Sequence, residues 1–171
     1  MSTQSFPVAS SFNTTSAELA DIDALVSLRK VLLSQGSTHY AATSIDADQA
    51  WQTSYRAWLE HHLQLRSPHI RVAVTRDPGR RVVACATGII DDRAPVIGSL
   101  NGRFGWVQSV VVARELRQRG LARQTMEYLL CWFARRHVHR VALQTTPAAL
   151  GLYRQLGFEP SGEDLLIRSS N

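Results

Sequence analysis

The amino-acid sequence predicts a mixed α/β fold in which helices flank a single β-sheet. The first observation is the size and composition of the chain: its 171 residues fit about one domain, and 44% are hydrophobic while 19% are charged. The second observation is the order of the patterns. Two helical patterns come first, a hairpin follows, and strands then alternate with helices. This order is typical of helices packed on one mixed sheet.

The N-terminal segment predicts a flexible tail followed by a helix. Thr15 and Glu18 fit a capping box, in which two side chains satisfy backbone donors at the start of a helix. We therefore expect a helix over residues 15–35, with apolar residues at helical spacing. Residues 1–14 are rich in Ser and Thr and form the predicted tail, so residues 15–171 make up a single domain.

A second helix is expected over residues 46–65, after a polar loop over residues 37–46. Ser67-Pro68 ends the helix, because the residue before a proline disfavours the helical conformation. Large apolar side chains recur on one face of this helix, namely Trp51, Tyr55, Trp58, Leu59 and Leu63. We interpret this stripe as core or as the wall of a substrate pocket rather than as a platform for stacking nucleic-acid bases.

The second half of the chain predicts a hairpin and then alternating strands and helices. Alternating polarity and the turn Asp77-Pro78-Gly79-Arg80 indicate the hairpin, whereas Pro147 is suited to the first turn of a helix and Gly157 to its end. The predicted elements are a hairpin of residues 71–76 and 81–90, a strand at 104–112, a helix at 120–137, a strand at 140–144, a helix at 147–157, and a final strand or strand pair from Phe158 onward that includes Leu165-Leu166-Ile167.

The net charge of +5 is carried almost entirely by arginine. Four arginines crowd one short segment: Arg114, Arg117, Arg119 and Arg123. A nucleic-acid surface would use a longer basic stripe interleaved with exposed aromatic side chains. The cluster therefore favours one compact anion over nucleic acid.

The remaining composition points away from membranes, disulfides and metals. No apolar run approaches the about 18 residues of a membrane-spanning helix, and the N-terminus lacks a signal-peptide pattern. Cys85 and Cys131 lie in apolar surroundings without CxxC spacing, which predicts buried thiols and a cytoplasmic protein. The histidines lack the cysteine or carboxylate partners of a zinc site, so no metal is expected at His61, His62, His69, His137 or His139.

The segment from Val110 to Ala122 carries the clearest chemical pattern. An apolar strand leads into a short Arg-rich turn, and a helix follows at once. The first turn of a helix leaves backbone N–H groups unpaired and carries partial positive charge. Gly120 allows the backbone to approach a ligand closely, and Arg117 and Arg119 add full charges. These features predict a cradle for linked phosphates, although neither a Walker A loop nor a GxGxxG fingerprint is present.

This segment resembles the signature of the GNAT superfamily of acyl-CoA-dependent N-acetyltransferases. The signature is Arg or Gln, two residues, Gly, one residue, then Gly or Ala, and Arg117-Gln118-Arg119-Gly120-Leu121-Ala122 fits it without a gap. A second motif of the family, A-x-x-L-Y-x-x-x-G-F, is similar to the run from Ala149 through Tyr153 to Phe158. The family often has Asn where this chain has Thr146. Two motifs in the expected elements make the resemblance specific.

The resemblance implies a fold, a cofactor and a set of site residues. The implied fold is a mixed, mostly antiparallel central sheet flanked by about four helices, and the co-substrate is acetyl-CoA, with no metal. Tyr153 is implied as the general acid for the leaving thiolate, and the backbone N–H of Val110 as the donor that stabilises tetrahedral charge. The implied cofactor-binding residues are Val110, Val111, Val112, Arg117, Gln118, Arg119, Gly120, Leu121, Ala122, Thr146 and Tyr153.

The implied function is transfer of an acetyl group from acetyl-CoA to a primary amine of a small molecule or peptide, by direct attack in a ternary complex. Many members of the family place a Glu base on the strand beside the cofactor, where this chain has Gln108 and Ser109. A non-catalytic acyl-CoA-binding or regulatory module on the same scaffold is therefore the alternative. The base is then a carboxylate or histidine from elsewhere, with His39, Asp46 and Asp91 as candidates, or ordered water.

The acceptor and the oligomeric state are left open by the sequence. Asp46, Asp48 and Glu60 are available for a cationic acceptor. Homodimers are common in the family, but nothing in the sequence marks an interface.

Overall fold

The computed structural model describes residues 11–34, 44–162 and 165–168. Within these ranges the chain forms a five-stranded sheet, four α-helices and two 3-10 helices. In chain order the elements are β1 (Asn13–Ser16), η1 (Leu19–Asp21), α1 (Ile22–Leu33), α2 (Ile45–Gln64), β2 (Ile70–Arg76), β3 (Val82–Asp92), β4 (Arg103–Val112), η2 (Arg114–Leu116), α3 (Leu121–Ala134), β5 (Arg140–Leu143) and α4 (Leu150–Gln155).

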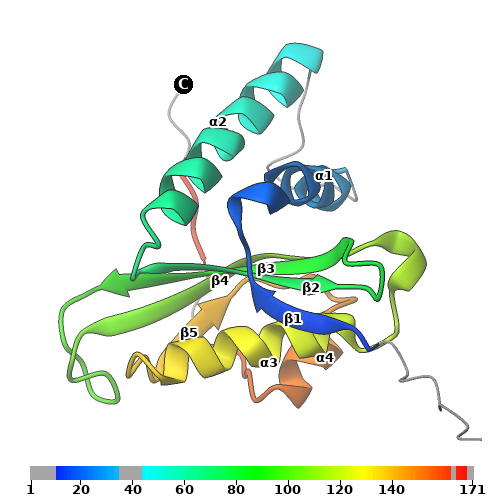
Figure 1. The fold of residues 1–171 in the computed structure, drawn as a ribbon. Coiled ribbons are helices and arrows are strands. Elements are labelled where there is room, and N and C mark those ends of the chain that lie inside the picture. Colours follow the sequence, from blue (N-terminus) through cyan, green and yellow to red (C-terminus); the bar gives the residue numbers. More distant parts are fainter. Residues whose placement is uncertain (1–10, 35–43, 163–164, 169–171) are drawn as a thin grey trace, which may run out of the picture.

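The sheet has the strand order β1-β2-β3-β4-β5. The first three pairings are antiparallel, and β5 runs parallel to β4. Helices α1 and α2 lie over one face of the sheet, and α3 and α4 lie over the other (Figure 1). The predicted mixed, mostly antiparallel sheet flanked by four helices is therefore confirmed for the described part of the chain.

Each face of the sheet carries its own hydrophobic core. The core on the α3 side includes Ala73, Ala86, Ile90, Val107, Met126, Leu129, Trp132, Phe133, Val138 and Tyr153. The core on the α1 and α2 side includes Ile22, Leu25, Val26, Leu28, Leu59, Val72, Val74, Cys85 and Val111, with Tyr55, Trp58 and Leu63 packed against it. The aromatic stripe on α2 therefore packs against the sheet, as its helical spacing predicts.

The predicted helix over residues 15–35 begins later than expected. Asn13 to Ser16 form an edge strand instead, so Asn13 and Thr14 belong to the sheet and not to the tail. The hydroxyl groups of Thr14 and Thr75 are 2.7 Å apart across this pair, which suits the preference of β-branched residues for strands. The capping box is one turn further on, where the carboxylate of Asp21 accepts from the N–H of Glu18 at 2.8 Å.

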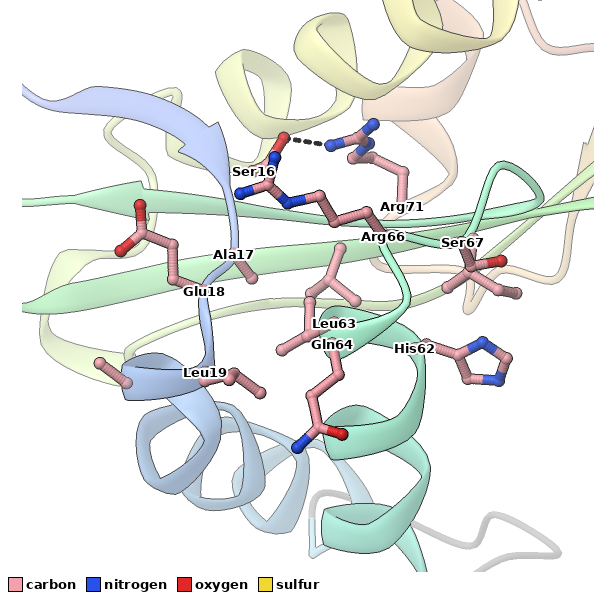
Figure 2. Close-up of a pocket in the computed structure, with 13 residues that line it drawn as sticks. Ser16, Ala17, Glu18, Leu19, His62, Leu63, Gln64, Arg66, Ser67 and Arg71 are labelled. Carbon is pink, nitrogen blue, oxygen red and sulfur yellow. Dashed lines mark hydrogen bonds between the residues drawn. The ribbon is translucent and has the colours of Figure 1, made fainter.

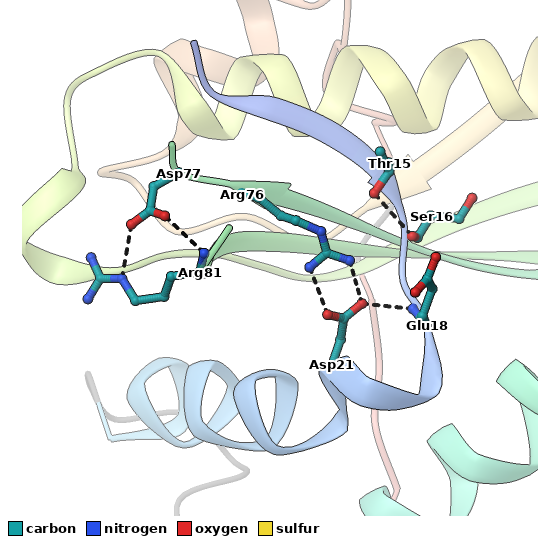
Figure 3. A network of polar contacts seen from close by, with 7 residues as sticks. All are labelled: Thr15, Ser16, Glu18, Asp21, Arg76, Asp77 and Arg81. Carbon is teal, nitrogen blue, oxygen red and sulfur yellow. Dashed lines mark hydrogen bonds and ion pairs between the residues drawn. The ribbon is translucent and has the colours of Figure 1, made fainter. Parts of the chain in front are cut away.

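A buried ion pair joins the start of α1 to the sheet (Figure 3). Arg76 donates to both carboxylate oxygens of Asp21, at 2.7 and 2.8 Å. Burial alone would raise the pKa of Asp21, but the hydrogen bonds from Arg76 and from the Glu18 N–H outweigh it and lower the pKa. A lowered pKa in the folded state means that the pair stabilises the fold above about pH 4, and that this stabilisation is lost as the pH falls through the lowered pKa.

Three further predictions need correction. Residues 165–168 form no strand, and the side chains of Leu165, Leu166 and Ile167 are exposed. Pro147 opens a turn rather than the helix itself, which starts at Leu150. Cys85 is a buried free thiol as expected, whereas Cys131 is exposed on α3.

The helices of the described ranges include none that is both long and apolar enough to cross a membrane.

Candidate active site

Strand β4 contains a β-bulge near its middle. Ala86 of β3 lies opposite two residues of β4, Ser109 and Val110. Ser109 adopts a left-handed conformation with φ of 58°, which costs a non-glycine residue on the order of 1 kcal/mol. The bulge reverses the alternation of the strand: Val107 and Val111 are four residues apart, yet they lie in the cores on opposite faces of the sheet. Backbone strain of this kind often marks a functional site.

Beyond the bulge, one edge of β4 separates from its neighbour. The last pair between β4 and β5 is Val107 with Leu143, where β5 ends, while β4 continues to Val112. The N–H of Ala113 donates to the carbonyl of Val83 at 2.8 Å, and paired and unpaired positions alternate along an antiparallel ladder. The backbone N–H and C=O of Val112 therefore point away from β3, toward the gap that β5 leaves.

The three predicted contact residues on this strand have different placements. Val110 packs against the core on the α3 side, which it shares with Tyr153. Val111 is only 4% exposed in the opposite core, and its backbone faces Cys85 on β3. The predicted cofactor contact therefore suits Val110 and Val112 but not Val111, because the bulge turns Val111 inward.

The turn after β4 is open at the position of the predicted phosphate cradle. Residues 117–120 are all exposed, and both Gln118 and Gly120 have left-handed backbones, with φ of 61° and 76°. A Cβ atom built on Gly120 would meet no atom within 4 Å. Helix α3 begins at Leu121 without a side-chain cap, so the N–H groups of its first turn face the open space. This turn fits a linked pair of phosphates.

The four arginines near the turn have distinct surroundings. The Nε of Arg117 donates to the carbonyl of Val112 at 3.4 Å, on the open edge of β4. Arg123 is held on the helix surface by Glu127, with 3.1 Å between Nε and the carboxylate. Arg114 and Arg119 are exposed. Arg117 and Arg119 thus lie in the exposed turn itself, whereas Arg123 forms an ion pair with Glu127 on α3. Leu121 is buried under the turn, and Ala122 is half-buried.

Tyr153 lies on α4, on the same side of the sheet as α3. Its side chain is 7% exposed and packs edge-on against Phe158, with 5.9 Å between the ring centroids. Burial raises the pKa of the phenol above its usual value, so the hydroxyl is protonated at neutral pH. Thr146 is exposed, and its carbonyl accepts from the N–H of Ala149 at 3.1 Å. The structure therefore places Tyr153 in the same core as Val110 and leaves Thr146 at the surface of the turn before α4.

The candidate bases do not gather at the bulge. His39 lies outside the described residues. Asp46 is exposed in the first turn of α2. Asp91 pairs with Arg93 at 3.0 Å, five residues along β3 from Ala86, which is about 17 Å in an extended strand.

The acidic groups considered for binding a cationic acceptor are either paired with other side chains or exposed on α2. The carboxylate of Asp48 contacts Lys30 at 2.9 Å and also accepts from Trp51 and Gln52. The hydrogen bond from Lys30 lowers the pKa of Asp48. Glu60 is exposed on α2.

Sequence reasoning missed a polar cluster on the α1 and α2 side of the bulge. Arg29 donates to the hydroxyl of Ser109 and lies over the ring of Tyr55, with 4.6 Å between its Cζ and the ring centroid. The buried hydroxyls of Tyr55 and Thr87 lie beside each other, yet neither is in hydrogen-bonding geometry with a described residue. Burial raises the pKa of the Tyr55 phenol, while Arg29 lowers it. Burial likewise raises the pKa of the Cys85 thiol to about 12.

One sequence pattern points to this cluster. Arg29 lies three residues after Val26, four after Leu25 and seven after Ile22, all three of which are buried. It therefore falls on the apolar stripe of α1, where a cation is unusual and indicates a specific role.

A separate cavity of about 740 Å³ lies at the other edge of the sheet (Figure 2). It is lined by the end of β1, η1, the last turn of α2 and the start of β2, and Arg71 donates to the hydroxyl of Ser16 in its wall. Leu63, from the apolar stripe of α2, lines it, but none of the predicted catalytic or cofactor-binding residues does. Among the described residues, no three or more His, Cys, Asp or Glu side chains are grouped so that they could hold a metal ion.

The open edge of β4 leads into a turn where the first amides of α3 are free, and this geometry is suited to an extended, phosphorylated ligand. The chain belongs to the acetyltransferase (GNAT) family, whose sequence pattern matches residues 36–158. The resemblance predicted from the two motifs is thereby confirmed. No curated protein matches the sequence at a significant level.

Solved acetyltransferase structures share the fold. A predicted acetyltransferase from Clostridium acetobutylicum, solved with acetyl-CoA, is 21% identical, with a TM-score of 0.75 over 92% of this chain and 96% of that one. Glucosamine-6-phosphate N-acetyltransferase from Arabidopsis thaliana is 15% identical, with a TM-score of 0.71 over 94% and 99%. An aminoglycoside N-acetyltransferase in complex with CoA is 20% identical, with a TM-score of 0.71 over 96% and 98%. At these identities the likeness concerns the fold.

Proposed function

We propose that this protein transfers the acetyl group of acetyl-CoA to a primary amine of a small molecule or peptide, by direct attack in a ternary complex. The observation that carries the proposal is the coincidence of two open features: the amides of the turn at residues 117–122 and the free edge of β4 at Val112. The turn is suited to the diphosphate of the coenzyme, and the free edge to the amides of its pantetheine arm.

The chain offers specific groups to each part of the coenzyme. Backbone N–H groups at the start of α3 bind the diphosphate, with the charges of Arg117 and Arg119 beside them. The carbonyl of Val112 accepts a hydrogen bond from the pantetheine arm in place of the 3.4 Å bond that it accepts from Arg117. This exchange frees the Arg117 guanidinium to turn toward the phosphates.

The chemistry follows from the position of the bulge. The acceptor nitrogen forms a bond to the acetyl carbon as the bond to sulfur breaks, and the N–H of Val110 stabilises the negative charge that collects on the carbonyl oxygen. Tyr153 gives its proton to the departing thiolate, since burial raises the pKa of this phenol and so keeps the hydroxyl protonated. The amine loses its proton to water, because Gln108 and Ser109 supply no carboxylate at the bulge.

A turnover assay tests the proposal. The full chain is incubated with acetyl-CoA and a panel of primary amines, the release of free thiol is followed, and the amide product is verified by mass. We expect amine-dependent thiol release. CoA binding without turnover of any amine would favour the non-catalytic acyl-CoA-binding module, which the missing carboxylate at the bulge keeps in consideration.

A further inference from the structure

We propose that Arg29 binds an anionic group of the acceptor, so that the preferred acceptor is a primary amine that carries a carboxylate or a phosphate close to its amino group. This inference rests on the proposed function and names the class of its acceptor. Its basis is the polar cluster on the α1 and α2 side of the bulge.

Arg29 is a cation without a matching carboxylate. Its side chain is half-buried between α1 and the sheet, and it does not appear in any ion pair of the described ranges. Its interactions are with the hydroxyl of Ser109 and with the face of Tyr55. A partly desolvated cation without a counter-ion is costly to a fold, whereas a guanidinium has five donors in a planar fork that matches a carboxylate or a phosphate.

Two further donors lie beside this guanidinium. The hydroxyls of Tyr55 and Thr87 are buried and close to each other, and neither makes a hydrogen bond of regular geometry within the part of the chain that the structure describes. A buried polar group without a hydrogen bond costs about 1–3 kcal/mol, and a fold retains such groups where a ligand satisfies them. Both hydroxyls can donate to anionic oxygens. The cluster thus presents one cation and two hydroxyls from three different elements, α1, α2 and β3.

The cluster is placed on the side from which an acceptor would attack. Ser109 precedes Val110, whose N–H is assigned to the thioester oxygen, and consecutive Cα atoms are about 3.8 Å apart. Val110 shares the core on the α3 side with Tyr153, whereas Arg29 lies on the opposite face of the sheet. The thiolate therefore leaves toward Tyr153 and the amine arrives from the face of Arg29. Because Arg29 contacts the residue next to Val110, we expect a short spacer between the amine and the anion.

The surrounding charges favour an anionic acceptor over a cationic one. Two carboxylates of α1 and α2 are already paired: Asp48 contacts Lys30 at 2.9 Å, and Asp23 contacts Arg56 at 2.7 Å. Asp46 and Glu60 are exposed on α2. Proteins of this fold include an aminoglycoside acetyltransferase and a glucosamine-6-phosphate acetyltransferase, so the fold accepts amines of either charge. Arg29 is the residue at the bulge that selects between them.

Matched acceptor pairs test the inference. Amino acids are compared with their α-amides, and aminoethyl phosphate with ethanolamine, by kcat/KM in the free-thiol assay. We expect the anionic member of at least one pair to be preferred by tenfold or more, and the pair that shows this distinguishes carboxylate from phosphate. We also expect Arg29→Gln to reduce the preference to less than threefold while CoA affinity, measured by titration, changes less than twofold. The matched control Arg56→Gln removes the same charge from an exposed ion pair and should retain the preference.

Two results would overturn the inference: a preference for the neutral amines, or an anionic preference that survives in Arg29→Gln. A binding measurement separates it from the acetyltransferase proposal. The CoA complex is titrated with N-acetyl amino acids, which are product-like anions. Binding that is lost in Arg29→Gln supports the anion site even if no amine is turned over, in which case only the catalytic proposal fails. Equal binding to both proteins, or none to either, in the absence of turnover counts against the inference.

Discussion

The two halves of strand β4 are built in opposite ways. The first half, residues 103–107, is paired with β3 on one edge and with β5 on the other, and its Gly105 is packed closely against Phe133 and Val141. The second half, residues 108–112, has a bulge, a left-handed serine and an edge that β5 leaves free.

The difference shows how one strand combines a scaffold with a site. Free backbone groups and unpartnered hydroxyls are unfavourable for stability, and they persist only where the surrounding structure holds them. The doubly paired half supplies this support, because it is paired with a strand on each edge and its Val107 lies in the core on the α3 side. Stability and ligand binding should therefore respond separately to mutations in the two halves and in the elements that adjoin them.

The largest expected effect is on the free half, through the turn that follows it. Gly120→Asp places a side chain and a negative charge over the amides at the start of α3, and we expect the Kd for CoA to rise by about 1000-fold, or about 4 kcal/mol. Gly162→Asp is the matched control, because Gly162 has the same φ of 76° and equally open surroundings. Calorimetric titration measures both. An unchanged Kd in Gly120→Asp would contradict phosphate binding at this turn. The second half of β4 could then no longer be regarded as leading into a binding site.

A smaller effect, on chemistry alone, is expected at Tyr153. Tyr153→Phe keeps the buried ring and removes the acid, so we expect kcat to fall by about 100-fold while the Kd for CoA changes less than twofold. Since burial raises the pKa of the phenol, wild-type kcat should show no decline that Tyr153 causes below about pH 10. Tyr128→Phe, which loses a 2.9 Å contact with Ser16 instead, serves as the control. Equal losses of kcat and CoA affinity in Tyr153→Phe would assign Tyr153 to packing.

Much of this contrast was accessible from the sequence, but the strained part was not. Local patterns predicted α2, the hairpin, α3 and the phosphate turn, because helical spacing, turn residues and the motif are all local. The bulge has no such signature: Ser109 is not a glycine, and a run of valines does not reveal which residue changes face. The edge strand at Asn13–Ser16 was missed since its stabilising partner, β2, lies more than 50 residues away.

The polar cluster and the C-terminus illustrate the same limit. Arg29, Tyr55 and Ser109 meet only in the folded chain, and the local hint was a single cation on the apolar stripe of α1. The apolar run Leu165-Leu166-Ile167 predicted a strand from composition alone. Its residues are exposed and form no strand within the described residues. The prediction was wrong because apolar composition does not specify which strand a segment pairs with.

The smallest expected effect tests the scaffold half directly. A Cβ on Gly105 would lie 2.9 Å from a ring carbon of Phe133 and 3.0 Å from a methyl carbon of Val141, so Gly105→Ala forces both side chains to move. Overpacking of this kind costs about 1–3 kcal/mol, and the lower entropy of the unfolded alanine chain offsets about 0.4–1 kcal/mol of it. We expect a net loss of about 1–2 kcal/mol in chemical denaturation, with the Kd for CoA within twofold. The control Gly151→Ala, on α4 with no atom within 4 Å, should be neutral or stabilising by up to about 1 kcal/mol. If Gly105→Ala reduced the free energy of CoA binding by more than it reduced the free energy of unfolding, the two halves of β4 would be coupled. The first half could then no longer be regarded as scaffold alone.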